Sequence, residues 1–379
     1  CPNWGRPLRC KLMPFADVYA GLPVLVTGHT GFKGSWLAIW LKELGADVAG
    51  FSLPQPPTVP ANFEVCRLGG QIEGVTGDVR DHDALADAIS RFRPRLVFHL
   101  AAQQLVLAAY REPKMTFDTN AGGTVNLLEA VRQSASVEAV VCVTTDKVYE
   151  ERNWLWGYRE NDRLGGHDPY SASKAMAELA IASYRRSFFE DGGPAVASAR
   201  AGNVIGGGDF AADRLLPDTM RALLAGEPVC VRNPAFVRPW QHVLESLSAY
   251  LWLGAKLLRE GHAYAEAWNF APRDIQAVTA QQVVEKALAL WGGGSWEQPA
   301  QAQAEKEATL LRLSWDKAAN RLGWHALYDW EEAVAATVDW FRIYQQRHLA
   351  HGESMYGVCA EQIGAYTERA RSTGLAWAE

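Results

Sequence analysis

The chain has 379 residues, 48% of them apolar and 21% charged, which is enough for two interlocked domains around a sizeable core. Its formal net charge of −6 argues against a basic surface for nucleic acid or anionic membranes. The sequence lacks a run of about 20 apolar residues, so we expect no membrane-spanning segment. Six cysteines occur without a CxxC motif or a regular spacing, which indicates a reducing, cytoplasmic compartment.

The first twelve residues, CPNWGRPLRCKL, carry basic charges but lack the apolar stretch of a signal peptide. Met13 fits a natural translation start. We therefore expect residues 1–12 to be a translated leader or an expression extension, and we leave them out of the fold prediction.

Strands and helices alternate along the first half of the chain. The sequence predicts strands at 22–28, 47–53, 72–79, 95–101, 139–145 and 195–201, with helices at 34–45, 82–92, 119–133 and 170–189. The strands are rich in β-branched and apolar residues on both faces, and the helices have ten or more residues. This pattern is typical of an α/β fold with a doubly wound parallel sheet covered on both sides.

The regular alternation stops after residue 201. Loops rich in glycine and proline then alternate with shorter helices. We expect residues 13–201 to form a dinucleotide-binding domain and residues 202–379 to form a smaller, mixed α/β domain that covers the substrate. Part of 235–265 is expected to return to the first domain.

The segment GHTGFKG, 28–34, gives a G-x-x-G-x-x-G pattern between a predicted strand and a predicted helix. Glycines without side chains let the backbone approach a pyrophosphate, and the helix N-terminus offers N–H donors and a positive dipole end. The pattern therefore predicts dinucleotide binding, with a structural turn as the alternative. The order Lys33-Gly34-Ser35 differs from the Gly-Lys-Ser/Thr of a P-loop.

The expected acidic residue at the end of the second strand is missing. That strand ends in Phe51-Ser52-Leu53, and 48–63 contains no Asp or Glu. Such an acid would bind the adenosine 2′-hydroxyl, so the choice between NAD and NADP stays open. Lys33 could favour an extra phosphate, although we expect it to be a solvated loop residue.

Two later strands also end in segments suited to a dinucleotide. GDVRD, 77–81, places Asp78 where it can accept a hydrogen bond from the adenine amine. HLAAQ, 99–103, supplies small residues against which the cofactor can lie flat. Each segment alone fits an ordinary loop equally well, but ligands of parallel sheets bind at this edge.

The segment VTTDKVYE, 143–150, leads from an apolar strand directly into two hydroxyls, a carboxylate and an amine. It is either a solvated turn or a set of proton-handling groups at the edge of the sheet. The segment PYSASK, 169–174, follows one unit later and places Tyr170 and Lys174 on one helix face. A phenol with a pKa of about 10 is a poor base, but a nearby ammonium and a positively charged nicotinamide would lower its pKa.

These motifs, in this order, resemble the extended short-chain dehydrogenase/reductase family. Within that family the chain is most similar to the CDP-glucose branch of the sugar-nucleotide 4,6-dehydratases, and the similarity covers residues 22–345. The segments that carry it are GHTGFKGSWL (28–37), TTDK (144–147), WGYRENDRLGGHDPYSASK (156–174), RAGNVIGGGDF (200–210), DRLLPD (213–218) and RPWQHVLE (238–245).

The resemblance implies a Rossmann-type domain that binds NAD, and a lyase that dehydrates CDP-glucose to its 4-keto-6-deoxy product. Transient oxidation at C4 would acidify the C5–H bond, water would leave across C5–C6, and the hydride would return to C6. The implied cofactor contacts are Gly28, Thr30, Gly31, Phe32, Lys33, Gly34, Asp78, Val79, Leu100, Ala101, Ala102, Gln103, Asn120, Tyr170 and Lys174.

The resemblance also assigns roles to the catalytic candidates. Tyr170 would deprotonate the C4 hydroxyl, Lys174 would lower its pKa and hold the ribose, and Thr145 would hydrogen-bond the C4 oxygen. Asp146 would protonate the departing C6 oxygen. Lys147 stands where many related dehydratases have the glutamate that acts as C5 base. Our hypothesis is that Lys147 acts in the elimination, and the alternative is a positioning or phosphate-contacting role.

The implied substrate contacts lie in the loops of the second half: Asn203, Arg214, Leu215, Arg232, Arg238 and His242. Converging guanidinium groups suit a nucleoside diphosphate, although a lone arginine is usually solvated. Arg200 is a further candidate by the same argument. Leu107 replaces an arginine expected in this branch, so diphosphate contacts are weaker or another arginine compensates.

Several alternatives stay open at this point. The chain could be a dehydratase for another nucleotide sugar, or a 4-epimerase, which has no need for Asp146. A non-catalytic NAD(P)-binding sensor is a third possibility, against which the full Thr/Asp/Tyr/Lys set argues. The sequence contains no HExxH motif and no Cys/His cluster, so we expect no metal. The resemblance implies a homodimer or homotetramer formed through the tyrosine-bearing helix and its neighbour.

Overall fold

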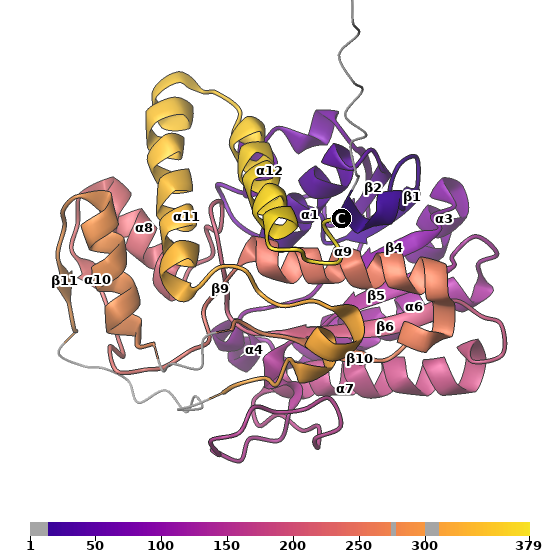
Figure 1. The fold of residues 1–379 in the computed structure, drawn as a ribbon. Helices are drawn as coiled ribbons and strands as arrows, with labels where there is room; N and C mark the ends of the chain where they lie inside the picture. Colours follow the sequence, from indigo (N-terminus) through magenta and orange to yellow (C-terminus); the bar gives the residue numbers. More distant parts are fainter. Residues whose placement is uncertain (1–13, 274–277, 300–310) are drawn as a thin grey trace, which may run out of the picture.

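Seven short strands form one parallel sheet in the computed structural model, which describes residues 14–273, 278–299 and 311–379 (Figure 1). The strands are β1 (Pro23–Thr27), β2 (Asp47–Ser52), β3 (Glu73–Thr76), β4 (Leu96–His99), β5 (Ala139–Val143), β6 (Ala195–Ala201) and β10 (Ala267–Phe270). Their order across the sheet is β10-β6-β5-β4-β1-β2-β3. The predicted doubly wound parallel sheet is confirmed, and the expectation for residues 1–12 lies outside the described residues.

Helices cover both faces of this sheet. The helices are α1 (Phe32–Glu43), α2 (Asn62–Val65), α3 (His82–Phe92), α4 (Val106–Arg111), α5 (Pro113–Phe117), α6 (Gly123–Gln133), α7 (Pro169–Tyr184), α8 (Leu215–Ala225), α9 (Val243–Glu260), α10 (Ala280–Trp291), α11 (Trp330–Ile343) and α12 (Tyr356–Ser372). α3, α6 and α7 pack side by side on one face, and α1 and α9 pack on the other. The helical connections between the strands therefore run over both faces of the sheet.

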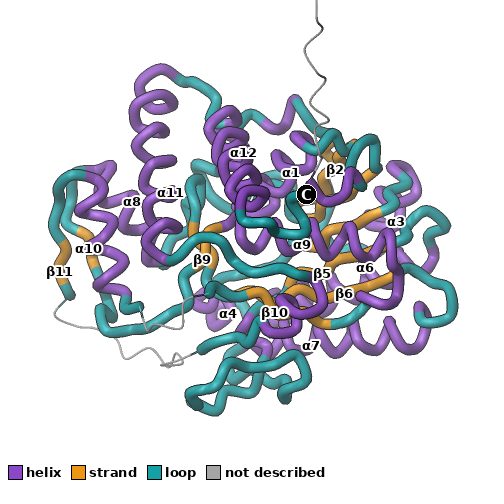
Figure 2. The backbone as a smooth tube through the Cα atoms, viewed as in Figure 1, coloured by secondary structure: helices purple, strands orange, loops and turns teal. Residues whose placement is uncertain are grey.

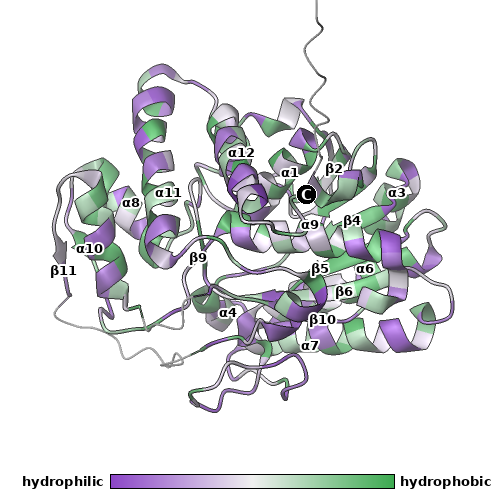
Figure 3. Cartoon of the chain, in the orientation of Figure 1, coloured by the Kyte–Doolittle hydropathy of each residue, from purple (hydrophilic) through white to green (hydrophobic). Residues whose placement is uncertain are grey.

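The burial of both faces explains why the central strands are apolar, whereas the edge strand β3 is largely exposed. Leu25 and Val140 point to the face under α3, α6 and α7, whereas Val26 and Val141 point to the face under α1 and α9. Successive side chains of a strand point to opposite faces, so both sets must be apolar. Figure 3 shows hydrophobic residues along β4, β5 and β6 at the centre of the molecule.

The second half of the chain forms a lobe beside the carboxyl edge of the sheet. It contains α8, α10 and α11, and two small parallel pairs: β7 (Val204–Ile205) with β9 (Gln241–His242), and β8 (Val229–Cys230) with β11 (Trp296–Glu297). Figure 2 shows long loops linking these elements. The division into two domains at residue 201 stays a prediction. Three later elements, α9, β10 and α12, pack against elements of the first half of the chain.

Most element boundaries differ from the sequence prediction by a few residues, and three differences bear on the site. α1 begins at Phe32 rather than at 34, because Gly31 already caps it. β3 ends at Thr76, so Asp78 lies beyond the strand in the connecting loop. The strand β10 was not predicted at all, because four residues give too short a pattern to separate from a loop.

The two ends of the described chain pack together. The rings of Phe15 and Trp377 stack with centroids 5.0 Å apart, and α12 packs against α1. Cys66 and Cys359, whose spacing in the sequence gave no indication of pairing, are buried with their Sγ atoms 3.8 Å apart. Among the described residues, no helix has the length and apolar character needed to cross a membrane.

Candidate active site

The glycine loop between β1 and α1 requires glycine at two positions for steric reasons. Gly28 has a φ of +74°, and a Cβ there would lie 2.7 Å from the backbone nitrogen of Ala101. A Cβ on Gly34 would lie 2.1 Å from the carbonyl oxygen of Gly28. No side chain caps the N-terminus of α1, so its first N–H groups can bind an anion. The loop therefore fits a dinucleotide pyrophosphate.

A cavity of about 940 Å³ extends from this loop along the carboxyl edge of β1, β2, β3 and β4, and we call it the cofactor cavity. It is bordered by Gly28, Thr30, Gly31, Phe32, Lys33, Gly34, Asp78, Val79, Leu100, Ala101, Ala102 and Gln103. Each of these residues belongs to the set predicted to contact the cofactor. The volume of the cavity and its lining of small, mostly apolar residues fit a bound dinucleotide.

The predicted adenine contact is held by a neighbouring arginine. The Asp78 carboxylate accepts hydrogen bonds from Arg80 at 2.9 Å to Nε and 2.5 Å to Nη2. These bonds lower the pKa of Asp78, so it is a carboxylate at neutral pH and can accept a hydrogen bond from an amine. At the end of β2, Ser52 and Leu53 border the cavity where an acidic residue would bind the ribose.

Two residues of the predicted cofactor set lie behind the cavity. Asn120 is buried and links Gln103 to the catalytic helix: its Nδ2 donates to the Gln103 carbonyl and to Ser173 Oγ, both at 2.9 Å. Lys174 is also buried and borders neither cavity. Asn120 therefore holds the HLAAQ segment in place, and the prediction that it contacts the cofactor does not agree with its position.

The expectation of a solvated Lys33 is wrong. The residue is half-buried at the first turn of α1, and its Nζ lies 3.5 Å from the hydroxyl of Tyr250 on α9. Burial, Arg214 and Lys174 lower the pKa of Lys33 to about 7. The sequence could not reveal this environment, because Tyr250 and Arg214 lie about 200 residues further along the chain.

The TTDK segment turns sharply where β5 ends. Thr145 is the N-cap of a single 3-10 turn over Asp146–Val148, and its Oγ1 accepts from the backbone nitrogen of Lys147 at 3.4 Å. The same hydroxyl donates to Asp146 Oδ1 at 3.0 Å. The turn therefore directs Thr145, Asp146 and Lys147 toward one cavity rather than into solvent.

The helix α7 presents the predicted pair, Tyr170 and Lys174, beside this turn. Asp168 caps the helix and accepts from the backbone nitrogen of Ser171 at 3.0 Å. Lys174 Nζ donates to the Val143 carbonyl at 3.2 Å, which joins α7 to the end of β5. Burial lowers the pKa of Lys174 to about 8. The structure thus brings Tyr170 and Lys174 to the end of the TTDK strand.

Burial dominates the electrostatics of the two acid–base candidates. It raises the pKa of Tyr170 to about 12, against a hydrogen bond with Thr145 that lowers it. Arg214 also lowers this pKa, whereas Asp146 and Asp168 raise it. Burial also raises the pKa of Asp146, against the opposing effects of Lys147, Thr145 and Arg238. A carboxyl with a raised pKa is suited to donate a proton.

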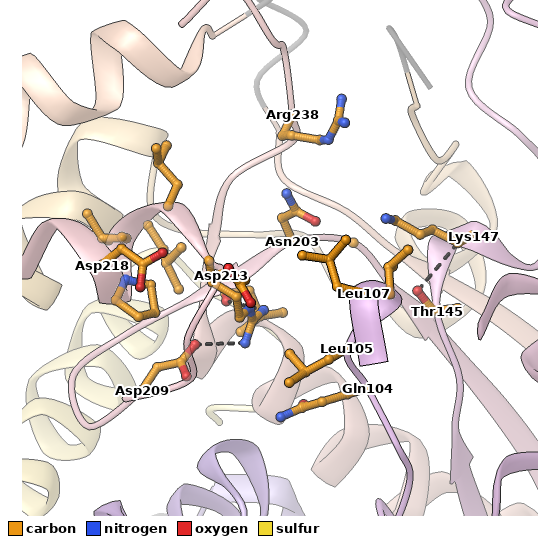
Figure 4. A pocket seen from close by; sticks show the side chains of 18 of the residues that line it. Gln104, Leu105, Leu107, Thr145, Lys147, Asn203, Asp209, Asp213, Asp218 and Arg238 are labelled. Carbon is orange, nitrogen blue, oxygen red and sulfur yellow. Dashed lines mark hydrogen bonds and ion pairs between the residues drawn. The ribbon is translucent and has the colours of Figure 1, made fainter. Parts of the chain in front are cut away.

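A second cavity, of about 330 Å³, meets the cofactor cavity beside Lys33, and we call it the substrate cavity (Figure 4). Its lining includes Thr145, Asp146, Lys147, Tyr170, Asn203, Arg214, Leu215, Arg232 and Arg238. In Figure 4, Lys147 extends into the cavity toward the side occupied by Asn203 and Leu107. All three predicted arginines of the substrate set therefore border the same space as the catalytic candidates.

His242 and Arg200 do not reach this space. His242 is fully buried at the N-cap of α9, beside the ring of Trp36, and burial lowers its pKa to about 3. Its predicted contact with substrate is therefore wrong. Arg200 is buried in an ion pair with Glu178 on α7, at 2.7 Å. Both residues are held inside the protein because the segments around them pair with other elements instead of forming free loops.

The sequence analysis missed several charged residues at the site, among them Asp213 and Asp218, which also border the substrate cavity. Asp209 is buried and pairs with Arg214 at 2.7 Å, which holds that guanidinium at the cavity. Arg111 borders the substrate cavity and lies four residues after Leu107 on α4, on the same face. Glu178 follows Lys174 by one helical turn. This spacing is the feature of the sequence that could have indicated that Glu178 lies near the site.

Two comparisons place the chain among known proteins. The family described as GDP-mannose 4,6 dehydratase matches residues 25–337. A CDP-glucose 4,6-dehydratase of Salmonella typhimurium is 46% identical over 356 residues, which cover 92% of this chain and 97% of that protein.

No cluster of metal-ligating side chains occurs in the part of the chain that the structure describes.

Solved structures agree with this placement. A dTDP-glucose 4,6-dehydratase from Streptomyces venezuelae with NAD bound has a TM-score of 0.72 at 25% identity, covering 86% of this chain and 98% of that one. A UDP-glucose 4-epimerase from Thermus thermophilus in complex with NAD has a TM-score of 0.71 at 26% identity, covering 84% and 98%. With its glycine loop, its Tyr170–Lys174 pair and its match over most of its length, the chain belongs to the GDP-mannose 4,6 dehydratase family.

Proposed function

We propose that this chain is an NAD-dependent lyase that converts CDP-glucose to CDP-4-keto-6-deoxyglucose. The observation that carries the proposal is the 46% identity with a CDP-glucose 4,6-dehydratase along almost the whole of both chains. The substrate cavity supports it, because a hydroxyl, a carboxyl, an amine and a phenol border one space. A 4-epimerase would use the phenol and the hydroxyl but has no step that needs the carboxyl.

The residues of the cofactor cavity fit NAD. The side-chain-free positions 28 and 34 and the uncapped start of α1 would hold the pyrophosphate, and Asp78 would accept a hydrogen bond from the adenine amine. Bound NAD supplies a hydride acceptor for C4 of the sugar and later a hydride donor for C6. The sugar must therefore lie where the two cavities meet.

Tyr170 and Thr145 act on the C4 oxygen in the first step. Tyr170, as phenolate, takes the proton of the C4 hydroxyl, and Thr145 holds the oxygen by a hydrogen bond. Because burial raises the pKa of Tyr170, the phenolate needs positive charge nearby. The ammonium of Lys174, held at the end of β5 one turn along α7, adds such charge.

Asp146 and Lys147 act in the elimination. The C4 ketone makes the C5 hydrogen acidic, so a modest base is sufficient to remove it. Asp146 donates its proton to the departing C6 oxygen, and the water that forms leaves the sugar. Lys147, which enters the same cavity from the adjacent position, removes the C5 proton.

Arginines bind the diphosphate of the substrate. Arg214, Arg232 and Arg238 border the substrate cavity from the second lobe. Arg111 borders it from α4, on the same helix face as Leu107, and we propose that it supplies the positive charge that Leu107 lacks. Bidentate guanidinium contacts would fix the nucleotide and leave the hexose near Tyr170.

The test is to offer CDP-glucose, dTDP-glucose, UDP-glucose and GDP-mannose separately to the NAD-loaded protein. We expect a 4-keto product, detected by its absorbance in alkali, with CDP-glucose and at least about 100-fold less with the others. A 4-keto product from another sugar nucleotide would reassign the substrate. Conversion of a substrate to its C4 epimer without a 4-keto product would make the chain an epimerase.

We also propose that the chain forms a homodimer through α6 and α7. These helices pack side by side and expose Val125, Met176 and Leu179, and Phe188 is exposed in the π-helical turn that follows α7. Large apolar side chains gathered on neighbouring helices are typical of a protein–protein interface. A second copy of the same two helices would cover them as a four-helix bundle.

A further inference from the structure

The substrate cavity has two ends, and a sugar nucleotide would span both. Figure 4 shows Asp218 on the opposite side of the cavity from Thr145 and Lys147, with Asn203 and Asp213 between them. A sugar nucleotide is a chain of hexose, diphosphate, ribose and base. If the proposed function holds, the hexose lies beside the catalytic candidates, so the base must lie at the end of the cavity that Asp218 borders.

The walls at this end of the cavity suit a flat base. Pro217 and Asp218 lie in the first turn of α8, which packs against β8. Cys230 of β8, Val231 directly after it and Ala280 at the start of α10 border the same space. Small and apolar side chains can cover the faces of a pyrimidine ring, whereas the edge of the ring needs polar partners. Asp218 supplies a polar group at this place.

The carboxylate of Asp218 has room for a further hydrogen bond. Its Oδ1 accepts from Arg221 Nη1 at 2.5 Å, and its Oδ2 has no donor among the described residues. Burial and Asp213 raise the pKa of Asp218, whereas Arg221 and Arg232 lower it, so the two guanidinium groups favour the carboxylate over the neutral acid. A carboxylate accepts hydrogen bonds and repels phosphate. Its partner on the ligand must therefore be a hydrogen-bond donor outside the diphosphate.

We infer that Asp218 makes the site select cytosine among the pyrimidine bases. Cytosine carries an amine at C4, and an aspartate can accept a hydrogen bond from it. Uracil and thymine carry a carbonyl oxygen at C4, which would place two acceptors against each other. The inference rests on the proposed function and adds to it a residue that distinguishes CDP-glucose from the UDP and dTDP sugars.

The test compares the dissociation constants of CDP and UDP, measured by isothermal titration calorimetry with the NAD-loaded protein, so that no turnover is needed. We expect the wild-type protein to bind CDP about 10-fold or more tightly than UDP. Asp218→Asn should bind UDP more tightly than wild type does and lose this preference, because an amide can also donate to the uracil oxygen. Asp213→Asn, which changes a second carboxylate of the same cavity, is the matched control and should keep the preference.

A ligand without the amine tests the same contact in the unchanged protein. The diphosphate of pyrimidin-2-one riboside lacks the group at C4, so wild type should bind it about 10-fold more weakly than CDP. Equal binding of these two ligands, or a CDP preference in Asp218→Asn within a factor of about two of wild type, would overturn the inference and leave CDP-glucose as the proposed substrate. Equal weakening of CDP and UDP in Asp218→Asn is such a result, and it would place the carboxylate at the ribose. A wild-type protein that binds CDP no more tightly than UDP would overturn both the inference and the proposed choice of CDP-glucose.

Discussion

In the proposed mechanism, Asp146 is the residue that distinguishes elimination from simple oxidation and reduction at C4. It is buried at the end of β5, and burial raises its pKa, so it can hold a proton next to a phenol and an amine. We expect Asp146→Asn to lower turnover by about 100-fold or more, because an amide does not protonate a leaving group. Oxidation at C4 should survive, so reduced cofactor should accumulate in a single turnover followed by its absorbance.

The control for this variant is Tyr170→Phe, which removes the base of the first step. It should form neither reduced cofactor nor 4-keto product. If Asp146→Asn turned over at the wild-type rate, Asp146 would not be the acid of the elimination.

Lys147 is expected to act on the C5 proton. Lys147→Ala should abolish the exchange of the C5 hydrogen with deuterated solvent and lower product formation by about 100-fold or more. Mass spectrometry of the recovered sugar nucleotide measures the exchange. Lys147→Arg is the matched variant, because it keeps the charge but does not act as a base near neutral pH. Exchange that continued in Lys147→Ala would place the C5 base on another residue.

At this scale, the sequence predicted the residues whose neighbours are local and missed those whose neighbours are distant. Tyr170 and Lys174 share one helix turn, so their spacing was sufficient to predict them. Lys33 was expected in solvent, because no residue near it in the sequence indicates its contact with Tyr250. His242 was expected at the substrate because it lies in a family-like motif, yet it fills the core beneath α9.

A buried polar network joins the catalytic elements to one another. The Glu178 carboxylate on α7 accepts from Thr144 at 2.5 Å, from Ser198 on β6 at 2.8 Å and from Arg200 on β6 at 2.7 Å. Arg200 in turn donates to the Tyr149 hydroxyl at 2.7 Å. The network therefore fixes the TTDK turn against the helix that carries Tyr170.

Removing one partner of this ion pair should destabilise the fold. We expect Arg200→Met to lower the free energy of unfolding by about 3–5 kcal/mol, because the Glu178 charge is left buried without its cation. Urea unfolding followed by tryptophan fluorescence measures the loss. The double variant Glu178→Gln/Arg200→Met removes both charges and should recover part of the stability. Equal losses in the single and double variants would show that the charges themselves do not matter.

The sequence predicted the elements that alternate regularly and missed those of the second half, whatever their length: β3 and β4 are as short as β10, and the unpredicted α9 has 18 residues. The strands β1 to β6 and the helices between them follow clear periodic patterns of several residues each. The strand β10 spans four residues, Ala267–Phe270, and pairs with β6 only because the chain returns after α9. Its Asn269 accepts from the Tyr149 hydroxyl at 2.7 Å, so this unpredicted strand also supports the site.

The whole molecule is expected to be at least a dimer. The Leu179 side chain on α7 is 60% exposed, and it lies among the other apolar residues of the proposed interface. We expect Leu179→Glu to shift the protein to a monomer at micromolar concentration, because the two added carboxylates, one from each protomer, would be buried against each other or against apolar surface in a four-helix bundle. Sedimentation velocity measures the mass.

The matched control for the dimer is Leu155→Glu. Leu155 is 77% exposed in the loop between β5 and α7, outside the proposed interface. This variant should keep the wild-type mass. A monomeric wild-type protein, or a dimer that survives in Leu179→Glu, would contradict the proposed interface.

The strand β10 lies far along the sequence from its partner β6, and this has a consequence for folding during synthesis. When the ribosome has made the chain through residue 201, β6 has its partner β5 but lacks β10, and α9 does not yet cover the face of β5 and β6. An open strand edge and an uncovered apolar face are both prone to aggregation. A fragment that ends after Ala201 should therefore sediment as aggregate in a cell lysate, and the nascent chain should depend on chaperones until about residue 270 has emerged.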